Sequence, residues 1–249
     1  MKQFDYESFY NKVGKVNGWD FSNIKSFSEG VTWNFYDEVQ KRSKKTDVLL
    51  DIGTGGGENI IRISSSLLLS IGIDLSNGML ETAESNLKHS NVSNVKFFQM
   101  SSDHLQFPSG FFDLVSSRHA PFSSTEIFKV LKIGGWFLTQ QVSEADKLNI
   151  KNAFSRGQDY DKTDGTLKGK YIRELKEAGF SEVQSFEYDA IEYFQRPEDL
   201  IFLLTNTPII HSFGKENKDY EILFEFIKSN QYAKGIRTNS KRFLIMAKK

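Results

Sequence analysis

Hydrophobic and polar residues follow a strand-like pattern repeatedly along the segment 47–141. Five short runs are almost continuously apolar, which is typical of strands covered on both faces of a sheet. These runs are Asp47–Ile52, Leu68–Asp74, Val95–Gln99, Phe112–Ser116 and Trp136–Gln140. The pattern therefore predicts five mostly parallel strands.

Helical periodicity occupies the intervals between these runs. Ser76 is placed to cap a helix, and Ser123 and Glu126 have the spacing of a capping box at the start of another. We expect Gly134–Gly135 to stop the second helix. The apolar face of the first consists of Met79, Leu80, Ala83 and Leu87. Strand–helix alternation predicts an α/β fold with a doubly wound, mostly parallel sheet, and a mixed α+β domain is the alternative.

The C-terminal part has a different pattern. Gly165–Ala178 predicts a helix, and Val183–Tyr188 and Arg242–Ala247 predict strands that pair in an antiparallel ribbon. Between these strands lie two amphipathic helical stretches, Pro197–Leu204 and Asp219–Ile227. We expect the intervening residues, 190–235, to form a helical lid inserted in a domain that spans 46–249.

Residues 1–45 are rich in aromatic side chains, and we predict that they form an N-terminal helical cap. Tyr10, Trp19 and Trp33 are candidates to line a substrate pocket, although aromatic residues at this frequency more often form core. The cap and the segment Pro197–Phe213, which contains His211, are expected to close over the sheet. The alternative is that the apolar run in this segment packs as core.

Composition narrows the possible functions. The chain has 249 residues, no cysteine, and 32 Lys+Arg against 32 Asp+Glu, so its net charge is zero. The charge balance argues against a protein that grips long nucleic acids, and the missing thiols exclude disulfides and cysteine chemistry. No histidine pair has metal-ligand spacing, so we expect no metal site. With no apolar signal core in residues 1–30 and no run long enough to span a bilayer, we expect a soluble, cytoplasmic protein without a membrane anchor.

The glycine-rich segment Asp51–Glu58 is the strongest chemical signal. A strand leads into three alternate glycines, a helix follows, and the next strand ends in Asp74. Such glycines let a ligand lie directly on the main chain, and a carboxylate after the second strand can accept hydrogen bonds from a ribose diol. Glu58 stands where a dinucleotide fingerprint requires glycine, and its charge would repel a pyrophosphate at the helix start. The segment therefore favours an adenosine ligand that carries a cationic sulfonium and amine.

Four segments in this order resemble the motifs of class I S-adenosylmethionine-dependent methyltransferases, among them small bacterial members. They are Val48–Gly57, Ile71–Ser76, Phe111–Val115 and Val130–Trp136. The resemblance is strong over residues 45–142 and weaker toward the C-terminus. It implies a Rossmann-like, seven-stranded sheet and S-adenosyl-L-methionine as cofactor.

The resemblance also implies a set of cofactor-binding residues. These are Asp51, Gly53, Thr54, Gly55, Gly57, Asp74, Leu75, Met79, Ser101, Ser102, Asp103 and Arg118. The family commonly has an aspartate where Ser101 stands, and that carboxylate accepts the adenine amino group. Here Ser101, Asp103 or a backbone carbonyl must take that role.

The loop after the fourth predicted strand carries the candidate catalytic residues. His119 is a candidate base or substrate-orienting group, and Arg118 a candidate to hold a carboxylate or phosphate. The alternative is a histidine satisfied by the backbone beside a solvent-facing arginine. Methyl transfer from a sulfonium mainly requires alignment and exclusion of water, so a catalytic base is optional.

We expect a methyltransferase that acts on a small molecule. An RNA methyltransferase is the second hypothesis, because Lys168, Lys170, Arg173 and Lys176 can form a basic patch. A non-catalytic protein that binds S-adenosylmethionine is the third, and Ser101 suggests it. The acceptor atom and the oligomeric state stay open.

Overall fold

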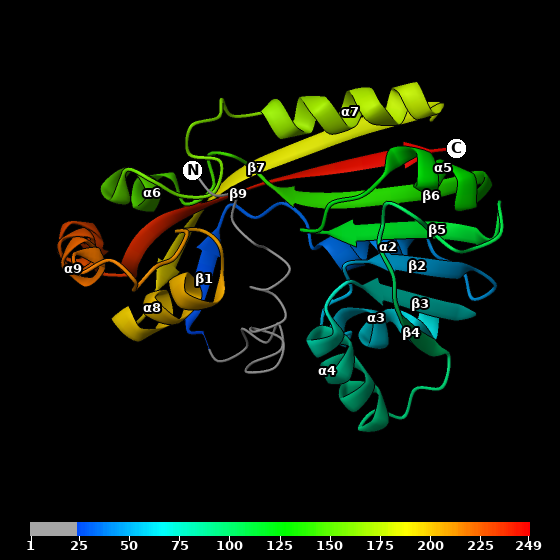
Figure 1. Ribbon diagram of the computed structural model, residues 1–249, viewed down its shortest axis with the longest axis horizontal. Coiled ribbons are helices and arrows are strands. Elements are labelled where there is room, and N and C mark those ends of the chain that lie inside the picture. The colour runs from blue at the N-terminus through cyan, green and yellow to red at the C-terminus, as the bar shows by residue number, and fades with distance from the viewer. Residues whose placement is uncertain (1–23) are drawn as a thin grey trace.

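A single sheet runs through the computed structural model, which describes residues 24–249 (Figure 1). In this range the sheet has nine strands in the order β1-β7-β9-β6-β5-β2-β3-β4, and β8 pairs with β9. The strands are β1 Ser26–Glu29, β2 Val48–Ile52, β3 Leu69–Asp74, β4 Val95–Gln99, β5 Phe112–Arg118, β6 Leu131–Val142, β7 Glu182–Phe194, β8 Gln231–Tyr232 and β9 Gly235–Lys248. The helices are α2 Phe35–Arg42, α3 Glu58–Ile63, α4 Asn77–Lys88, α5 Ser124–Val130, α6 Leu148–Phe154, α7 Thr166–Ala178, α8 Pro197–Asn206 and α9 Asp219–Asn230, with a 3₁₀ turn, η1, at Ser64–Ser66.

Five neighbouring strands, β4, β3, β2, β5 and β6, are parallel, whereas β9 is antiparallel to both β6 and β7. This arrangement confirms the α/β fold with a mostly parallel sheet. The sheet exceeds the seven strands expected by two short ones, β1 and β8. All five predicted strands are present, and the predicted antiparallel ribbon is longer at both ends than its sequence signal.

Both faces of the parallel strands are buried, as their continuous apolar runs predicted. Along β2, Leu50 and Ile52 enter the core beneath α5 and α7, while Leu49 enters the core beneath α2, α3 and α4. Val115 and Leu114 divide in the same way on β5. Alternate residues therefore pack in opposite directions, which is why neither face of these strands can be polar.

The predicted helix caps are confirmed. The Ser76 hydroxyl accepts from the Met79 amide at the start of α4, and the Ser123 hydroxyl accepts from the Glu126 amide at the start of α5. The predicted stop at Gly134–Gly135 is wrong. Helix α5 ends at Val130, and β6 begins at once, pairing with β5. The two glycines instead make an irregularity in β6, where Gly134 has φ +81° and pairing with β5 resumes beyond it.

Beyond its pairing with β6, the β7–β9 ribbon extends as an arm. We define the arm as Asp189–Phe194 and Gly235–Lys241 together with β1, β8, α6, α8 and α9. Its helices gather around the end of the ribbon, away from the parallel strands (Figure 1). Leu200, Leu204, Leu223 and Phe226 form a core there with α6.

The structure tests part of the N-terminal helical cap predicted for residues 1–45. Ser26–Glu29, predicted as part of a helical cap, form a strand because they extend the sheet edge beside β7, whereas α2 is helical as expected. Tyr10 and Trp19 lie outside the described residues. None of the helices between residues 24 and 249 combines the length and the hydropathy that crossing a lipid bilayer demands.

Candidate active site

The glycine loop between β2 and α3 lies at the carboxyl edge of the parallel strands. Gly53, Gly55 and Gly57 have φ values of +68°, +56° and +74°, a region that side chains disfavour. A Cβ on Gly53 would lie 2.3 Å from the Ala120 Cβ, and one on Gly57 would lie 2.4 Å from the ring of Phe97. The loop thus requires glycine for its own backbone and for close packing against its neighbours.

Asp74, the last residue of β3, holds this loop against the start of α4. Its carboxylate accepts from the Gly55 amide at 3.0 Å and from the Ser76 amide at 2.9 Å. Burial raises the pKa of Asp74, and the hydrogen bonds from backbone amides oppose that rise. A carboxylate has about four lone-pair positions, and the backbone amides of Gly55, Leu75 and Ser76 use part of this capacity. The link to Gly55 is a structural role that sequence reasoning missed.

The carboxylate of Asp51 is buried and accepts hydrogen bonds from two hydroxyl groups, which we call its hydroxyl cage. The Ser116 hydroxyl donates to Asp51 Oδ1 at 2.5 Å, and the Tyr36 hydroxyl donates to Oδ2 at 3.2 Å. Desolvation raises the pKa of Asp51 to about 6, although these hydrogen bonds favour its ionised form. Ser116 faces Asp51 across the β2–β5 register, a pairing that the sequence does not encode locally. Tyr36 arrives from α2 and was also missed.

The remaining predicted cofactor residues lie at the same carboxyl edge of the parallel strands and differ in their exposure to solvent. Leu75 is 51% exposed beside Asp74, whereas Met79 and Thr54 are buried. The Ser101 hydroxyl accepts from the Asp103 amide at 3.2 Å in a local turn, followed by an exposed Asp103 side chain. Ser102 lies in the same turn. Parallel pairing of β3 with β4 places this turn next to Asp74.

At the end of β5, Arg118 is exposed and His119 has φ +58°. The His119 amide donates to the Gln140 carbonyl at 2.8 Å, which holds this unfavourable backbone conformation in place. Its ring Nε2 lies 3.1 Å from Gln140 Nε2. Burial, with the charges of Arg118 and Arg242, holds the pKa of His119 well below its usual range. This lowering of the pKa favours the neutral form of the ring.

His119 also lines a small cavity of about 70 Å³. The other lining residues are Gln141, Val142, Ser143, Asp146, Lys151, Gln158, Asp159, Leu167 and Ile209. Ile209, from the predicted lid, reaches this cavity, but His211 is not among its lining residues. Burial lowers the pKa of Lys151, whose ammonium donates to the Glu144 and Gln158 carbonyls. Sequence reasoning missed these polar residues because they follow β6 without any recognisable motif.

Trp33 is the one predicted aromatic pocket residue within the described range. Its indole Nε1 donates to Gln140 Oε1 at 2.8 Å, and its ring packs on Tyr188 with centroids 4.6 Å apart. Trp33 therefore contacts the site through Gln140, whose partner is His119.

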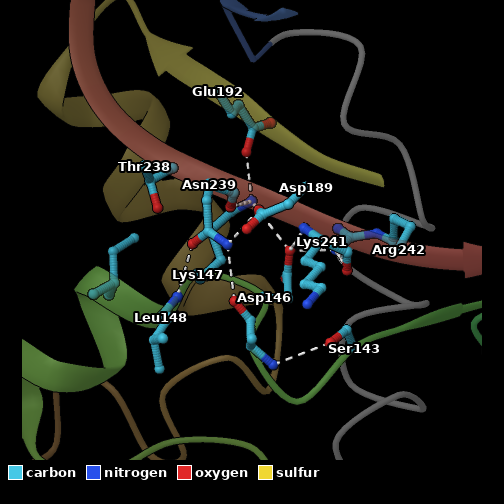
Figure 2. Close-up of polar contacts among 12 residues, drawn as sticks. Ser143, Asp146, Lys147, Leu148, Asp189, Glu192, Thr238, Asn239, Lys241 and Arg242 are labelled. Carbon is cyan, nitrogen blue, oxygen red and sulfur yellow. Dashed lines mark hydrogen bonds and ion pairs between the residues drawn. The ribbon is translucent and has the colours of Figure 1, made fainter. Parts of the chain in front are cut away.

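A buried network of charges fixes the junction between the cavity and the arm (Figure 2). Asp146, which also lines the cavity, pairs with Arg242, and Lys147 pairs with Glu192 at 2.5 Å. The Lys147 ammonium also donates to the Asn239 carbonyl at 3.0 Å. The Arg242 guanidinium and hydrogen bonding counter desolvation and keep the pKa of Asp146 below its usual value. In residues 24–249, no three carboxylate or imidazole groups are arranged to hold a metal ion.

Known proteins are most similar to this chain in its parallel half, which we define as strands β2–β6 and the helices between them. Residues 49–135 match the family model described as a methyltransferase domain. The chain is 36% identical over 97 residues to the uncharacterized methyltransferase YcgJ of Bacillus subtilis (strain 168), a match that covers 36% of this chain and 38% of YcgJ. It is 35% identical over 116 residues to a demethylmenaquinone methyltransferase of Lactococcus lactis subsp. lactis, covering 43% and 46% of the two chains. The chain thus spans less than half the length of these two relatives.

The fold extends further than the sequence similarity. The crystal structure of YcgJ superimposes with a TM-score of 0.60 at 21% identity and covers 86% of this chain and 97% of that one. Strand order, the glycine loop and the family match over residues 49–135 agree. Residues 49–135 thus match a methyltransferase domain, and these findings support the class I S-adenosylmethionine-dependent methyltransferase family.

Proposed function

We propose that this protein transfers a methyl group from S-adenosyl-L-methionine to a small molecule. The observation that carries the proposal is the convergence of the Gly53–Gly57 loop, Asp74 and the Ser101–Asp103 turn at one carboxyl edge. The loop offers backbone without side chains, Asp74 offers a carboxylate to a ribose, and exposed Leu75 offers an apolar surface for adenine. Buried Asp51 and Glu58 at the start of α3 supply negative charge for the cofactor's amine and sulfonium.

The cavity beside His119 supports a small acceptor. Its polar lining and its volume of about 70 Å³ suit a compact polar group rather than a nucleic-acid backbone. Two lysines of the basic patch on α7 are paired, Lys168 with Glu187 and Lys170 with Glu174, which weakens the case for RNA. One relative is named a demethylmenaquinone methyltransferase, so a demethylated quinone belongs among the acceptors to test.

In the proposed reaction, a nucleophile on the acceptor attacks the methyl carbon as the carbon–sulfur bond breaks. The electron pair of the broken bond stays on sulfur, which leaves as the neutral thioether S-adenosylhomocysteine, so the step needs no oxidant. A proton carried by the nucleophile is released to solvent. The protein's contribution is to align the two reactants and to exclude water. The cofactor supplies the activated methyl group when it is bound.

Calorimetry with S-adenosylmethionine, S-adenosylhomocysteine and NAD tests the cofactor. We expect the first two to bind and NAD to bind far more weakly, because Glu58 repels a pyrophosphate. Tighter NAD binding would overturn the cofactor assignment. Methyl-labelled cofactor is then incubated with cell extract split into small-molecule and RNA fractions. Label in the RNA fraction, or binding without any transfer, would contradict the proposed acceptor class.

A further inference from the structure

A chain of two side-chain hydrogen bonds connects the N-terminal region to the candidate catalytic histidine. Trp33 precedes α2, Gln140 lies on β6, and His119 follows β5, so three separate segments meet here. The indole Nε1 of Trp33 lies 2.8 Å from Gln140 Oε1, and the Gln140 amide nitrogen lies 3.1 Å from His119 Nε2. The order of these contacts has a chemical consequence for the ring.

An indole N–H is a donor only, so the Gln140 atom that faces Trp33 must be the carbonyl oxygen. The amide NH₂ group, which is also a donor only, then faces His119 Nε2. Nε2 must accept this hydrogen bond and cannot carry a proton. The proton of the neutral imidazole therefore resides on Nδ1.

The imidazolium form is disfavoured by the same contacts. Protonating Nε2 would place two N–H groups against each other across 3.1 Å. The charged groups around the ring come from several elements: Arg118 on β5, Arg242 on β9, and Asp146, Lys151 and Asp159, which share the cavity. Burial and the two arginines hold the pKa of His119 well below its usual range, in agreement with the hydrogen bonds.

We propose that Trp33 and Gln140 lock His119 as the neutral Nδ1–H tautomer, so that it donates a hydrogen bond to an oxygen of the methyl acceptor and does not act as a general base. Nδ1 is the polar ring atom left for a ligand of the cavity, because Nε2 is occupied by Gln140. The acceptor class is then a molecule with a carbonyl, carboxylate or phenolate oxygen near its nucleophile. The tautomer is a property of the protein alone, whereas the role toward the acceptor rests on the proposed function.

Long-range ¹H–¹⁵N spectra of the histidines test the tautomer without any substrate. The chain has four histidines, and His119→Gln identifies the signals of His119. We expect the wild type at pH 7 to show one unprotonated nitrogen at Nε2 and one protonated nitrogen at Nδ1. An Nε2–H or imidazolium pattern would overturn the proposal, whatever the outcome for cofactor binding.

Two variants change the hydrogen bonds that join Trp33, Gln140 and His119. Gln140→Glu replaces the amide donor by an acceptor, so His119 is expected to become protonated at Nε2. Trp33→Phe removes the donor that orients the amide, and a mixture of tautomers is expected. Trp136→Phe, which changes an indole stacked near Arg42 and Lys248 and away from Gln140, is the matched control and leaves the His119 signals unchanged. If the His119 nitrogen signals of folded Gln140→Glu and Trp33→Phe are the same as in the wild type, Gln140 and Trp33 do not determine the tautomer.

The donor role is tested by methyl transfer to the small-molecule fraction of the extract. A histidine base contributes about 10²–10⁴-fold, so its loss would reduce the rate by that factor and remove a limb of the pH profile. The proposal expects His119→Gln, which retains an N–H donor, to lose less than about tenfold with the shape of the pH profile unchanged. A loss beyond 10²-fold together with a changed profile would assign His119 as the base. Absence of transfer by the wild type would instead refute the proposed function and leave the spectroscopic result standing.

Discussion

The parallel half and the arm belong to one sheet but bury polar groups in different ways. In the parallel half, the buried carboxylate of Asp51 is surrounded by hydroxyls and has a raised pKa of about 6. At the junction with the arm, Asp146 is also buried but pairs with Arg242, and its pKa is lowered. Burial destabilises the charged form of Asp51, whereas the guanidinium of Arg242 stabilises the charged form of Asp146.

This difference distinguishes the proposed cofactor site from a structural junction. A buried acid that is hydrogen-bonded mainly to hydroxyls is unfavourable for the fold in its charged form, and groups with such perturbed pKa values cluster at functional sites. A buried acid with its own cation needs no ligand, and it fixes the geometry of the elements that carry the pair. We therefore propose that Asp51 favours a cationic cofactor in the parallel half, whereas the Asp146–Arg242 pair holds the arm in place.

Arg242→Met gives the largest expected effect. It leaves Asp146 buried without its main countercharge, and removing one partner of a buried pair costs about 3–5 kcal/mol in the free energy of unfolding. Urea denaturation followed by circular dichroism measures the loss. A variant within about 0.5 kcal/mol of the wild type would show that the junction does not depend on this pair.

Asp74→Ala tests the parallel half alone. It removes a carboxylate proposed to bind the ribose and is expected to weaken S-adenosylmethionine binding by about 1.5–3 kcal/mol, as for a hydrogen bond to a charged group. Calorimetry measures the dissociation constant. Glu84→Ala, an exposed change on α4, is the control and should leave the constant unchanged. If both variants bind the cofactor as the wild type does, the ribose lies elsewhere.

Asp51→Asn is expected to affect stability and binding in opposite directions. The folded state keeps the Asp51 proton up to about pH 6, whereas the model value for an unfolded aspartate is 3.8. The favourable contribution of this group is therefore present below about pH 4 and is lost as pH rises toward 6. The variant should gain on the order of 1 kcal/mol at pH 7.5, since it loses a buried charge but also a hydrogen-bond acceptor.

The same variant separates the ligand role of Asp51 from its cost to the fold. Cofactor affinity of the wild type should rise between pH 5 and 7 as Asp51 ionises, and Asp51→Asn should bind more weakly without this rise. Melting temperatures and calorimetry across this pH range measure both effects. A variant that is less stable at every pH would mean that the hydroxyl cage favours the charged carboxylate more than burial disfavours it.

Lys248→Met gives the smallest expected effect. Its pair with Glu182 spans 3.5 Å between half-exposed side chains on the ribbon, where solvent screens the charges. We expect a change within about 0.5 kcal/mol in urea denaturation. Both variants replace a cation of β9 by methionine, so the ratio of the two losses measures what burial adds. Equal losses would remove the distinction between the junction and an ordinary surface pair.

Local patterns were sufficient for the parallel half of this protein. The apolar runs predicted the five strands, Ser76 and Ser123 marked the helix starts, and the glycines with Asp74 marked the edge where we propose that the cofactor binds. These signals are readable because each depends on neighbours within a few residues or on a simple period. The break at Gly134–Gly135 was misplaced because strand pairing with β5, not the helix, decides where the backbone bends.

Only the tertiary structure decided the chemistry of the site's interior. Ser116 and Tyr36 reach Asp51 from 65 and 15 residues away, and Trp33 reaches Gln140 from 107 residues away. Sequence alone proposed His119 as a base or as a group that orients the substrate. Its neighbour Gln140 and the remote Trp33 determine which ring nitrogen can hold a proton. The sequence determines which residues are available and on which strand they end, but protonation depends on desolvation and on distant partners, which exist only after the chain has folded.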